Sequence, residues 1–342
     1  MRTPPPGTID GDSAHWLVAR VSVASVFSLD ENSVSLHLGM IGLGRMGGNM
    51  ALRLARAGVA VVGLDPNPDA GAELAATPGC SVVEDMEALV HALPAPRVVW
   101  LMVPAGEQTE ETIAALAPRL SSEDVLVDGG NAFYKDSVRR AVELASYGVR
   151  FVDCGVSGGI WGLEHGYTLM FGGSPAAARA IEPIVELLAP AKDRGWLHCG
   201  PSGSGHFVKM IHNGVEYGMM QALAEGLTLL KGKADFALDV AAIAETWRHG
   251  SVVRSWLLDL TADFLREDAE LADVAPLVAD SGEGRWTVAE AVEQGVPAPV
   301  LSLALAMRFA SQGKGEYADR LLAMMRKGFG GHKVVEQSRA KP

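Results

Sequence analysis

Four polar side chains occur within ten residues of a segment that otherwise has the composition of a core helix. The segment KMIHNGVEYG, residues 209–218, lies in GSGHFVKMIHNGVEYGMMQALAEGLTLLKG, whose later part is rich in Ala, Leu and Met. On an α-helix, Lys209, Asn213 and Glu216 stand at i, i+4 and i+7 and share one face. A lysine in a dry site can act as a base, and a glutamate nearby can stay protonated and act as an acid. The spacing indicates an acid–base site, with a solvated lysine–glutamate stripe as the alternative.

The helix that carries these residues is expected to be buried. Large apolar residues flank the polar ones, namely Phe207, Val208, Met210, Ile211, Met219 and Met220. Gly214 and Gly218 each cost about 1 kcal/mol relative to alanine in a helix. That cost is easier to understand if another group approaches the backbone closely, and we expect this group to be the substrate. His206, just before Lys209, is predicted to orient the start of the helix.

A second motif lies near the beginning of the regular pattern. GMIGLGRMG has the form G-x-G-x-x-G, and it follows an apolar run and opens a helical stretch. In that context the glycines allow a tight turn and a close approach to a pyrophosphate, which the helix N-terminus attracts. We predict a nicotinamide dinucleotide site, with a structural turn as the alternative. The predicted cofactor-binding residues are Gly42, Leu43, Gly44, Arg45, Met46, Gly47, Asp65, Val103 and Asn131.

Asp65 bears on which dinucleotide is bound. It ends the second predicted strand, about 20 residues after the glycines, where a carboxylate would accept hydrogen bonds from the ribose hydroxyls. A carboxylate there would repel a 2′-phosphate, and the following DPNPDA supplies no arginine to hold one. The sequence therefore favours NAD over NADP.

Strand-like and helix-like stretches alternate from Leu36 to about residue 200. Apolar runs such as VAVVGLD, RVVWLMVP, DVLVDGGN, VRFVDCGVSGG and TLMFGG are separated by helical patterns. This alternation predicts a parallel sheet with helices on both faces. Strand signals stop near Gly203, and the chain is then predicted to be helical to about residue 330. We expect an α/β Rossmann-type dinucleotide-binding domain, residues 36–202, followed by an all-α helical domain for substrate binding and dimerisation, residues 203–335.

The two ends of the chain fall outside this pattern. Residues 1–35 contain acidic residues, and Arg20 interrupts their only apolar stretch, so they fit neither a secretory signal nor a transit peptide. We expect either a disordered extension or a start assigned too far upstream. Residues 336–342 are expected to form a disordered tail.

The composition restricts the class of partner. The chain has 342 residues, which is long enough for two domains with an ample core. Of these residues 48% are hydrophobic and 20% are charged, as is ordinary for a globular protein. No apolar run reaches the roughly 18–20 residues needed to span a bilayer. The formal net charge of −12 disfavours a nucleic-acid partner but allows a local positive pocket for a small anion. Cys80, Cys154 and Cys199 lack metal-ligand spacing and indicate reduced thiols in a cytoplasmic protein.

Four motifs together resemble the decarboxylating 6-phosphogluconate dehydrogenases. They are VSGGIWGLEHGYTLMFGG, GSGHFVKMIHNGVEYGMMQALAEG, GEGRWT and FGGH, and the resemblance runs from Leu36 to about Val335, as in the short form of the family. It implies conversion of 6-phosphogluconate to ribulose 5-phosphate, CO₂ and NADH, in the pentose phosphate pathway or in gluconate catabolism. It also implies that Lys209 is the base for the C3 hydroxyl and that Glu216 is the acid that protonates C1 of the enediol. No metal is needed, because the C3 ketone accepts the electrons freed by decarboxylation and protonated Lys209 polarises it.

The resemblance further implies a set of substrate-binding residues. They are Asn131, Ser157, Gly158, Gly159, His212, Asn213, Tyr217, Arg285, Thr287, Arg308, Arg326 and His332. Within this set the phosphate pocket would be formed by Tyr217, Arg285, Thr287 and Arg308. Arg326 and His332 match residues that reach the neighbouring subunit's site, which implies a homo-oligomer with shared active sites. The chain departs from the family at Ala132, where a serine often follows the asparagine, and at Arg285, where many relatives carry lysine.

Two other functions remain as alternatives. Other β-hydroxyacid dehydrogenases, such as those acting on 3-hydroxyisobutyrate, share the glycine motif, the serine–glycine–glycine loop and the lysine–asparagine spacing. They generally lack the glutamate at position 216 and the GRWT and FGGH segments. A non-catalytic dinucleotide-binding sensor is disfavoured because both the base and the acid are present.

Overall fold

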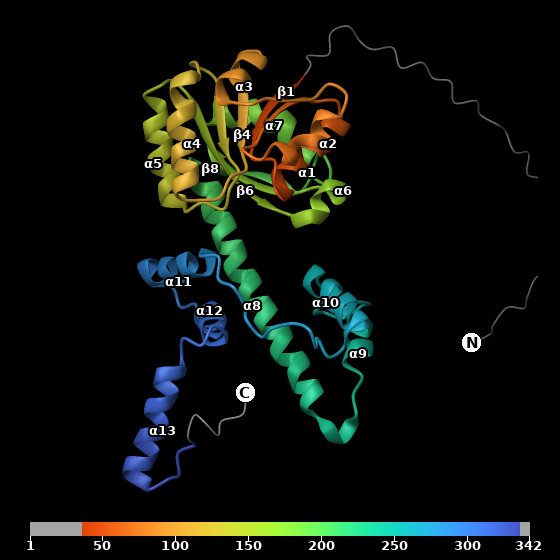
Figure 1. Ribbon diagram of the computed structural model, residues 1–342, viewed down its shortest axis with the longest axis vertical. Helices are drawn as coiled ribbons and strands as arrows, with labels where there is room; N and C mark the ends of the chain where they lie inside the picture. Colours follow the sequence, from red (N-terminus) through yellow and green to blue (C-terminus); the bar gives the residue numbers. More distant parts are fainter. Residues whose placement is uncertain (1–35, 336–342) are drawn as a thin grey trace, which may run out of the picture. The chain divides into compact units, whose positions relative to one another are not determined.

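The computed structural model describes residues 36–335, and the predicted extension and tail lie outside that range. The described part begins with an eight-stranded sheet in the spatial order β3-β2-β1-β4-β5-β6-β7-β8 (Figure 1). The strands are β1 (His37–Ile41), β2 (Ala60–Leu64), β3 (Ser81–Val82), β4 (Val98–Leu101), β5 (Val125–Asp128), β6 (Arg150–Ser157), β7 (Thr168–Gly173) and β8 (Trp196–Gly200). The strand order reverses at β1 and β4, as in a Rossmann-type sheet. The predicted fold class is confirmed.

One strand pair departs from the predicted parallel sheet. β6 and β7 are antiparallel, whereas the other pairs of the sheet are parallel. Residues 158–167 join the two strands and contain a 3-10 turn (Gly159–Trp161) and the short helix α6 (Gly162–His165), which is too little chain for a parallel crossover. β3 and β8 were not predicted, because β3 has two residues and neither strand is a run of buried residues.

Alternate strand residues enter two apolar cores, one on each face of the sheet. In β5, Val125 and Val127 join the core under α1 (Arg45–Arg56) and α7 (Pro175–Leu188). Leu126 joins the core under α3 (Met86–Ala92), α4 (Glu107–Leu116) and α5 (Tyr134–Ala145). The pleat of a strand produces this two-residue alternation. Burial of both faces explains why the strands read as continuous apolar runs, and the predicted helices on both faces are confirmed.

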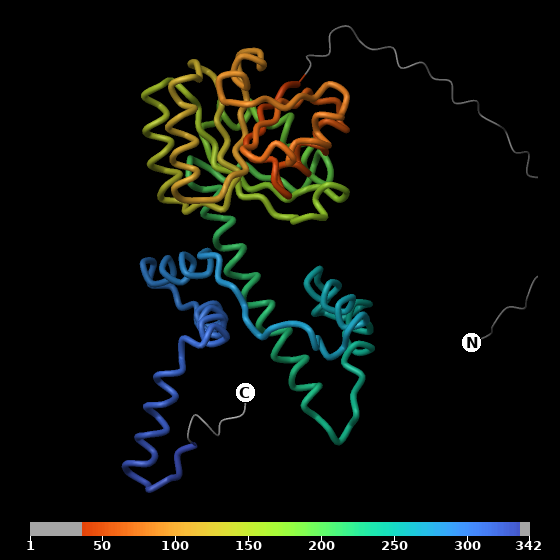
Figure 2. The backbone as a smooth tube through the Cα atoms, in the orientation of Figure 1, coloured from red at the N-terminus to blue at the C-terminus, as the bar shows by residue number. Residues whose placement is uncertain are grey.

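After β8 the described chain is built from helices and loops. The helices are α8 (Ser204–Gly232), α9 (Val240–Trp247), α10 (Trp256–Glu267), α11 (Glu283–Gln294), α12 (Pro299–Ser311) and α13 (Glu316–Gly330). The predicted helical run to about residue 330 is confirmed, and Figure 2 shows α8 as one uninterrupted helix. Among the described residues, no helix has both the length and the apolarity needed to cross a membrane.

α8 is less buried than its sequence suggested. Its N-terminal part packs against β6 and β7, and other parts pack against α9, α11 and α12. On the remaining face, Val215 is 47% exposed, Met219 43% and Leu229 76%. The expectation of a buried helix is wrong for this face, because elements of the same chain cover only part of the helix circumference.

Candidate active site

The start of α8 is held by a buried aspartate. Asp153 in β6 is fully buried, and its Oδ1 accepts a hydrogen bond from the Gly203 amide at 2.6 Å while its Oδ2 accepts one from the His206 amide at 2.8 Å. The first amides of a helix have no partner within the helix, so both oxygens of the carboxylate satisfy groups that would otherwise be unpaired. The His206 ring Nδ1 lies 2.7 Å from the Ser137 hydroxyl on α5. These contacts fix where α8 begins relative to the sheet.

Lys209 comes one turn later and lies in a dry environment. It is 7% exposed, and its Nζ donates a hydrogen bond to Asn213 Oδ1 at 2.8 Å. A Cβ placed on Gly155 of β6 would lie 2.2 Å from the Lys209 Cβ, so this glycine lets the lysine stem lie against the sheet. Burial lowers the pKa of Lys209, and the negative charges of Glu216 and Glu283 oppose that effect only in part. A lysine held this way is suited to accept a proton.

Glu216 is in a wetter environment than Lys209. Its side chain is 41% exposed, and its Oε2 lies 3.9 Å from His212 Nδ1. His212 Nδ1 in turn lies 3.0 Å from Asn213 Oδ1, the oxygen that also accepts from Lys209. Lys209, Asn213 and Glu216 therefore lie on one side of α8, as their helical spacing predicted, and His212 is their neighbour there.

These side chains line one cavity of about 1170 Å³. The sequence-predicted residues that line it are Met46, Asn131, Ser157, Gly158, Gly159, Lys209, His212, Asn213, Glu216, Tyr217 and Arg308. The cavity thus brings together residues from the first helix, the loop after β5, the end of β6, α8 and α12. Its walls are largely apolar, and among them Lys209 and Arg308 supply positive charges that could bind an anionic group.

Arg308 supplies the positive charge of this cavity on the side of α12. Its guanidinium carbon lies 3.4 Å from the centre of the Tyr217 ring, and its Nη1 donates to the Ala279 carbonyl at 2.7 Å. The Tyr217 hydroxyl lies 3.1 Å from the Ser281 hydroxyl. Stacking on the ring leaves donors of the guanidinium available for an anion.

Four predicted substrate-binding residues lie outside the lining of this cavity. Arg285 is exposed, and its Nε donates to Asp280 Oδ2 at 2.5 Å. Thr287 is buried, and its hydroxyl lies 2.9 Å from the carbonyls of Met210 and Glu283. Arg326 and His332 are exposed, on α13 and just after it. For these four residues, substrate contact stays a prediction.

The helix glycines make room for other helices. A Cβ on Gly214 would lie 2.6 Å from Thr287 Cγ2 on α11, and one on Gly218 would lie 3.2 Å from Leu301 Cδ2 on α12. The inference that something approaches the α8 backbone closely is sound. The approaching groups are side chains of α11 and α12, so the expectation that these glycines make room for substrate is wrong.

The glycine motif has the geometry expected of a dinucleotide loop. Gly42 has φ +92°, and a Cβ there would lie 2.5 Å from the Met102 carbonyl oxygen. A Cβ on Gly47 would lie 1.9 Å from the Gly42 carbonyl oxygen, so this glycine allows α1 to start close to β1. Gly44 faces open space, which leaves its backbone accessible to a phosphate. The residues present fit a dinucleotide.

Asp65 closes the motif from β2. Its Oδ2 accepts a hydrogen bond from the Leu43 amide at 2.7 Å, and its Oδ1 accepts one from Asn67 at 2.8 Å. The carboxylate is therefore oriented toward the glycine loop. Arg45 is exposed at the start of α1, directly after the glycine loop. Val103 lies on another side of this loop, because a Cβ on Gly42 would be 3.3 Å from Val103 Cγ1.

Comparison with known proteins agrees with this geometry. The model of the NAD-binding domain of 6-phosphogluconate dehydrogenase matches residues 37–199, and the model of the C-terminal domain of the same enzyme matches residues 205–339. The chain belongs to the 6-phosphogluconate dehydrogenase family. It is 44% identical over 304 residues to the NAD(+)-dependent, decarboxylating 6-phosphogluconate dehydrogenase of Haloferax volcanii, a match that spans 88% of this chain and 99% of the relative.

Longer members of the 6-phosphogluconate dehydrogenase family match over part of their length. The NADP(+)-dependent, decarboxylating enzyme of Bacillus subtilis is 38% identical over 292 residues, which is 82% of this chain and 62% of the relative. The solved 6-phosphogluconate dehydrogenase of Plasmodium falciparum has a TM-score of 0.75 at 27% identity and covers 89% of this chain and 67% of its own. A 3-hydroxyisobutyrate dehydrogenase of Salmonella typhimurium has a TM-score of 0.69 at 22% identity over 82% of this chain and 95% of its own, so it shares the fold.

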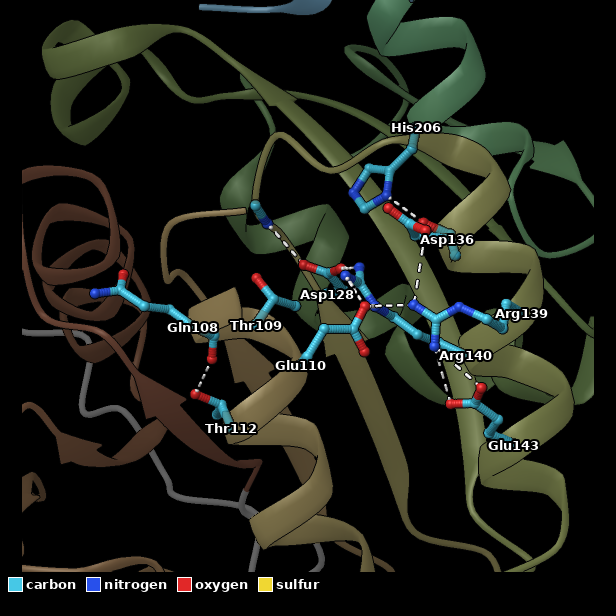
Figure 3. Close-up of polar contacts among 12 residues, drawn as sticks. Gln108, Thr109, Glu110, Thr112, Asp128, Asp136, Arg139, Arg140, Glu143 and His206 are labelled. Carbon is cyan, nitrogen blue, oxygen red and sulfur yellow. Dashed lines mark hydrogen bonds and ion pairs between the residues drawn. The ribbon is translucent and has the colours of Figure 1, made fainter. Parts of the chain in front are cut away.

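A buried ion-pair network supports the loop that carries Asn131 and was not predicted. Asp128, at the end of β5, accepts from the Gly130 amide at 3.1 Å and from Arg140 Nη1 at 2.9 Å. Arg140 is 1% exposed and also donates to Glu110 Oε1 on α4 at 2.8 Å (Figure 3). The arginine and its two carboxylates come from three separate elements, so no local spacing in the sequence could predict that they meet. One available signal was an aspartate at the end of a fully apolar strand.

The same loop is tied to α11 by aromatic residues. Phe133 and Trp286 have ring centroids 5.2 Å apart, and the Tyr134 hydroxyl donates to Glu290 Oε2 at 2.7 Å. These contacts reach from the start of α5 to α11, so they limit how far the loop with Asn131 can move from α8.

Among the described residues, no group of three or more His, Cys, Asp or Glu side chains has an arrangement that could hold a metal ion.

Proposed function

We propose that the protein catalyses the oxidative decarboxylation of 6-phospho-D-gluconate to D-ribulose 5-phosphate and CO₂, with NAD as the preferred oxidant. The observation that carries this proposal is a buried lysine of lowered pKa in the same cavity as a partly exposed glutamate, an asparagine and an arginine. Membership of the 6-phosphogluconate dehydrogenase family supports it, as does the 44% identical relative named as NAD(+)-dependent and decarboxylating.

In the proposed mechanism Lys209 acts first. The dinucleotide would be held by its pyrophosphate on the glycine loop, and its nicotinamide would supply the acceptor for the hydride from C3. Neutral Lys209 takes the proton of the C3 hydroxyl, and the resulting ammonium polarises the new C3 carbonyl. That carbonyl accepts the electron pair freed when the carboxylate leaves as CO₂. Glu216 then protonates the carbon that lost the carboxylate, which is C1 of the product.

Binding and orientation are assigned to the other residues around the cavity. Asn213 holds Lys209 Nζ and, with His212, Ser157, Gly158 and Gly159, is proposed to bind the sugar acid. Arg308 and Tyr217 are proposed to bind the phosphate, with Arg285 and Thr287 as further members predicted from the family motifs. Asn131 is proposed to stand where substrate and nicotinamide meet, because it lines the cavity on the side of the sheet.

The preference for NAD rests on Asp65. Its carboxylate lies at the end of β2, bonded to the Leu43 amide of the glycine loop. A 2′-phosphate would bring negative charge to this carboxylate, whereas ribose hydroxyls can donate hydrogen bonds to it. The NAD(+)-dependent relative of Haloferax volcanii supports the same preference.

A homo-oligomer with shared active sites is part of the proposal. Arg326 and His332 lie outside the cavity of their own chain, and α8 exposes an apolar face. If a partner chain supplies Arg326, a mixture of the inactive variants Lys209→Met and Arg326→Ala should regain activity after subunit exchange. Without shared sites, the mixture would stay inactive.

One assay tests the reaction directly. Purified protein is incubated with 6-phosphogluconate and either NAD or NADP, and reduced cofactor and CO₂ are measured together. We expect equal amounts of both products and a higher kcat/KM with NAD. Parallel reactions with 3-hydroxyisobutyrate test the other β-hydroxyacid dehydrogenases, and turnover with that acid alone would overturn the proposal.

A further inference from the structure

Glu283 is a buried carboxylate to which neither the sequence motifs nor the proposed mechanism gives a role. It is the first residue of α11, is 4% exposed and lines the same cavity as Lys209. Its Oε2 is shielded from solvent and has no hydrogen-bond partner among the described residues. An unpaired buried carboxylate oxygen is costly, so a partner of positive charge is expected during function.

The backbone around Glu283 is held tightly against α8. The Thr287 hydroxyl lies 2.9 Å from the Glu283 carbonyl and 2.9 Å from the carbonyl of Met210, the residue that follows Lys209. A Cβ on Gly284 would lie 2.5 Å from Tyr217 Cε2, so this glycine allows close approach of the two helices. The first turn of α11 is therefore fixed beside the catalytic part of α8.

Two carboxylates act on Lys209, and their surroundings differ. The negative charges of Glu216 and Glu283 both raise the pKa of Lys209 against the larger effect of burial. Glu216 is 41% exposed and lies near His212, whereas Glu283 is buried and keeps a free oxygen. A protonated Glu216, as the acid step requires, is neutral and cannot balance a charge on Lys209.

We propose that Glu283, on the wall of the cavity shared with Lys209, is the counter-ion that stabilises the ammonium form of Lys209 without direct contact, and so leaves Glu216 free to serve as the acid. This inference rests on the proposed function. In the oxidation step the substrate O–H bond breaks, an N–H bond forms on Lys209 Nζ, and the hydride leaves C3 with its two electrons for the nicotinamide. The positive charge that appears on Lys209 is then offset by the negative charge already present on Glu283.

The elements packed against this part of α8 carry further ionisable groups. They include Asp153 and Cys154 on β6, His198 and Cys199 on β8, Tyr134 and Arg140 on α5, Arg285 and Glu290 on α11 and Arg308 on α12, together with His206, His212, Glu216 and Tyr217 on α8 itself. Asp153 is committed to the α8 amides, and Glu290 to Tyr134. Among the acids, Glu216 and Glu283 are the two whose charge acts on Lys209.

The test replaces Glu283 by glutamine, which keeps the shape and removes the charge. Without the carboxylate the pKa of Lys209 falls further, so the acidic limb of kcat/KM against pH should move to lower pH by about one pH unit. We expect kcat to fall about tenfold with little change in KM for 6-phosphogluconate. Glu283→Asp keeps the charge and should give a limb between those of the wild type and Glu283→Gln. Glu293→Gln is the control, because Glu293 is an exposed carboxylate of the same helix paired with Lys135, and its profile should match the wild type.

A second readout does not depend on turnover. The rate at which trinitrobenzenesulfonate modifies Lys209, located by peptide mass spectrometry and measured against pH, should show the same shift in Glu283→Gln. If glutamine prevents folding, Glu283→Ser serves as the neutral variant with the same expected shift. An unmoved Lys209 titration in a folded neutral variant would overturn the counter-ion role, even if activity fell. If the wild type shows no turnover with 6-phosphogluconate while the Lys209 titration still shifts in Glu283→Gln, the proposed function is rejected and the counter-ion role is kept.

Discussion

The buried pair between Arg140 and Asp128 gives a sharp test of how the sheet supports the active-site loop. The Arg140 side chain is 1% exposed and that of Asp128 is fully buried, and their atoms lie 2.9 Å apart. Arg140→Met removes the charge but keeps an unbranched side chain. Asp128 would then be a buried carboxylate without its main partner, and removing one member of such a pair costs about 3–5 kcal/mol. Because domains are stable by roughly 5–15 kcal/mol, the variant should fold with a clearly reduced urea midpoint.

The neighbouring arginine is a matched control. Arg139 lies on the same helix, is 45% exposed, and pairs with Glu110, Asp136 and Glu143 at the surface. Exposed ion pairs contribute about 0–1 kcal/mol, so Arg139→Met should change the free energy of unfolding by no more than about that amount. Urea unfolding followed by tryptophan fluorescence and by circular dichroism measures both variants.

A double variant checks the physical reason. In the Arg140→Met background, Asp128→Asn removes the uncompensated charge while its side-chain oxygen can still accept from the Gly130 amide. We expect this second change to restore part of the lost stability, whereas in the wild type it should destabilise. An Arg140→Met loss no larger than that of Arg139→Met would refute the reasoning, as would an Asp128→Asn effect of equal size in both backgrounds.

Three further predictions concern the cofactor, the chemistry and the helix packing. Lys209→Met should abolish oxidation while cofactor binding, followed by fluorescence titration, is retained. Glu216→Gln should slow formation of ribulose 5-phosphate, which needs protonation of C1, more than formation of reduced cofactor, and wild-type rates would remove that residue from its role. Asp65→Ser should lower the ratio of kcat/KM for NAD over NADP, and an unchanged ratio would contradict the basis of the preference. Gly214→Ala should destabilise by up to about 2 kcal/mol, since overpacking costs about 1–3 kcal/mol and alanine returns about 1 kcal/mol of helix propensity. Gly226→Ala, on the same helix with open space at its Cβ, should instead stabilise by up to about 1 kcal/mol, and equal effects of the two changes would count against the packing argument.

Local patterns in the sequence predicted most of the α/β part. Apolar runs separated by helical patterns marked β1, β2, β4, β5, β6 and β7, because buried strands must be apolar on both faces. The edge strand β8 and the two-residue β3 were missed, because their residues are partly exposed and carry no such run. The antiparallel pairing of β6 and β7 follows from how little chain joins them. A sequence pattern marks a strand but does not state its direction.

The candidate site divides in the same way. Lys209, Asn213 and Glu216 could be grouped from the sequence, because helical spacing alone puts them on one face. Glu283 and Asp153 could not be joined to them, because they come from α11 and β6 and meet α8 only through the fold. The role first given to Gly214 was wrong for the same reason, since nothing in the sequence says that α11 faces this glycine.

The sequence by itself thus determined the local features: the glycine loop, the alternation of strands and helices, and the polar face of α8. These depend on residues a few positions apart, for which backbone geometry fixes the spacing. Only the tertiary structure decided which distant groups share an environment, such as Asp128 with Arg140, or Glu283 with Lys209. Their charges are set by burial and by neighbours from other elements, and those exist only once the chain has folded.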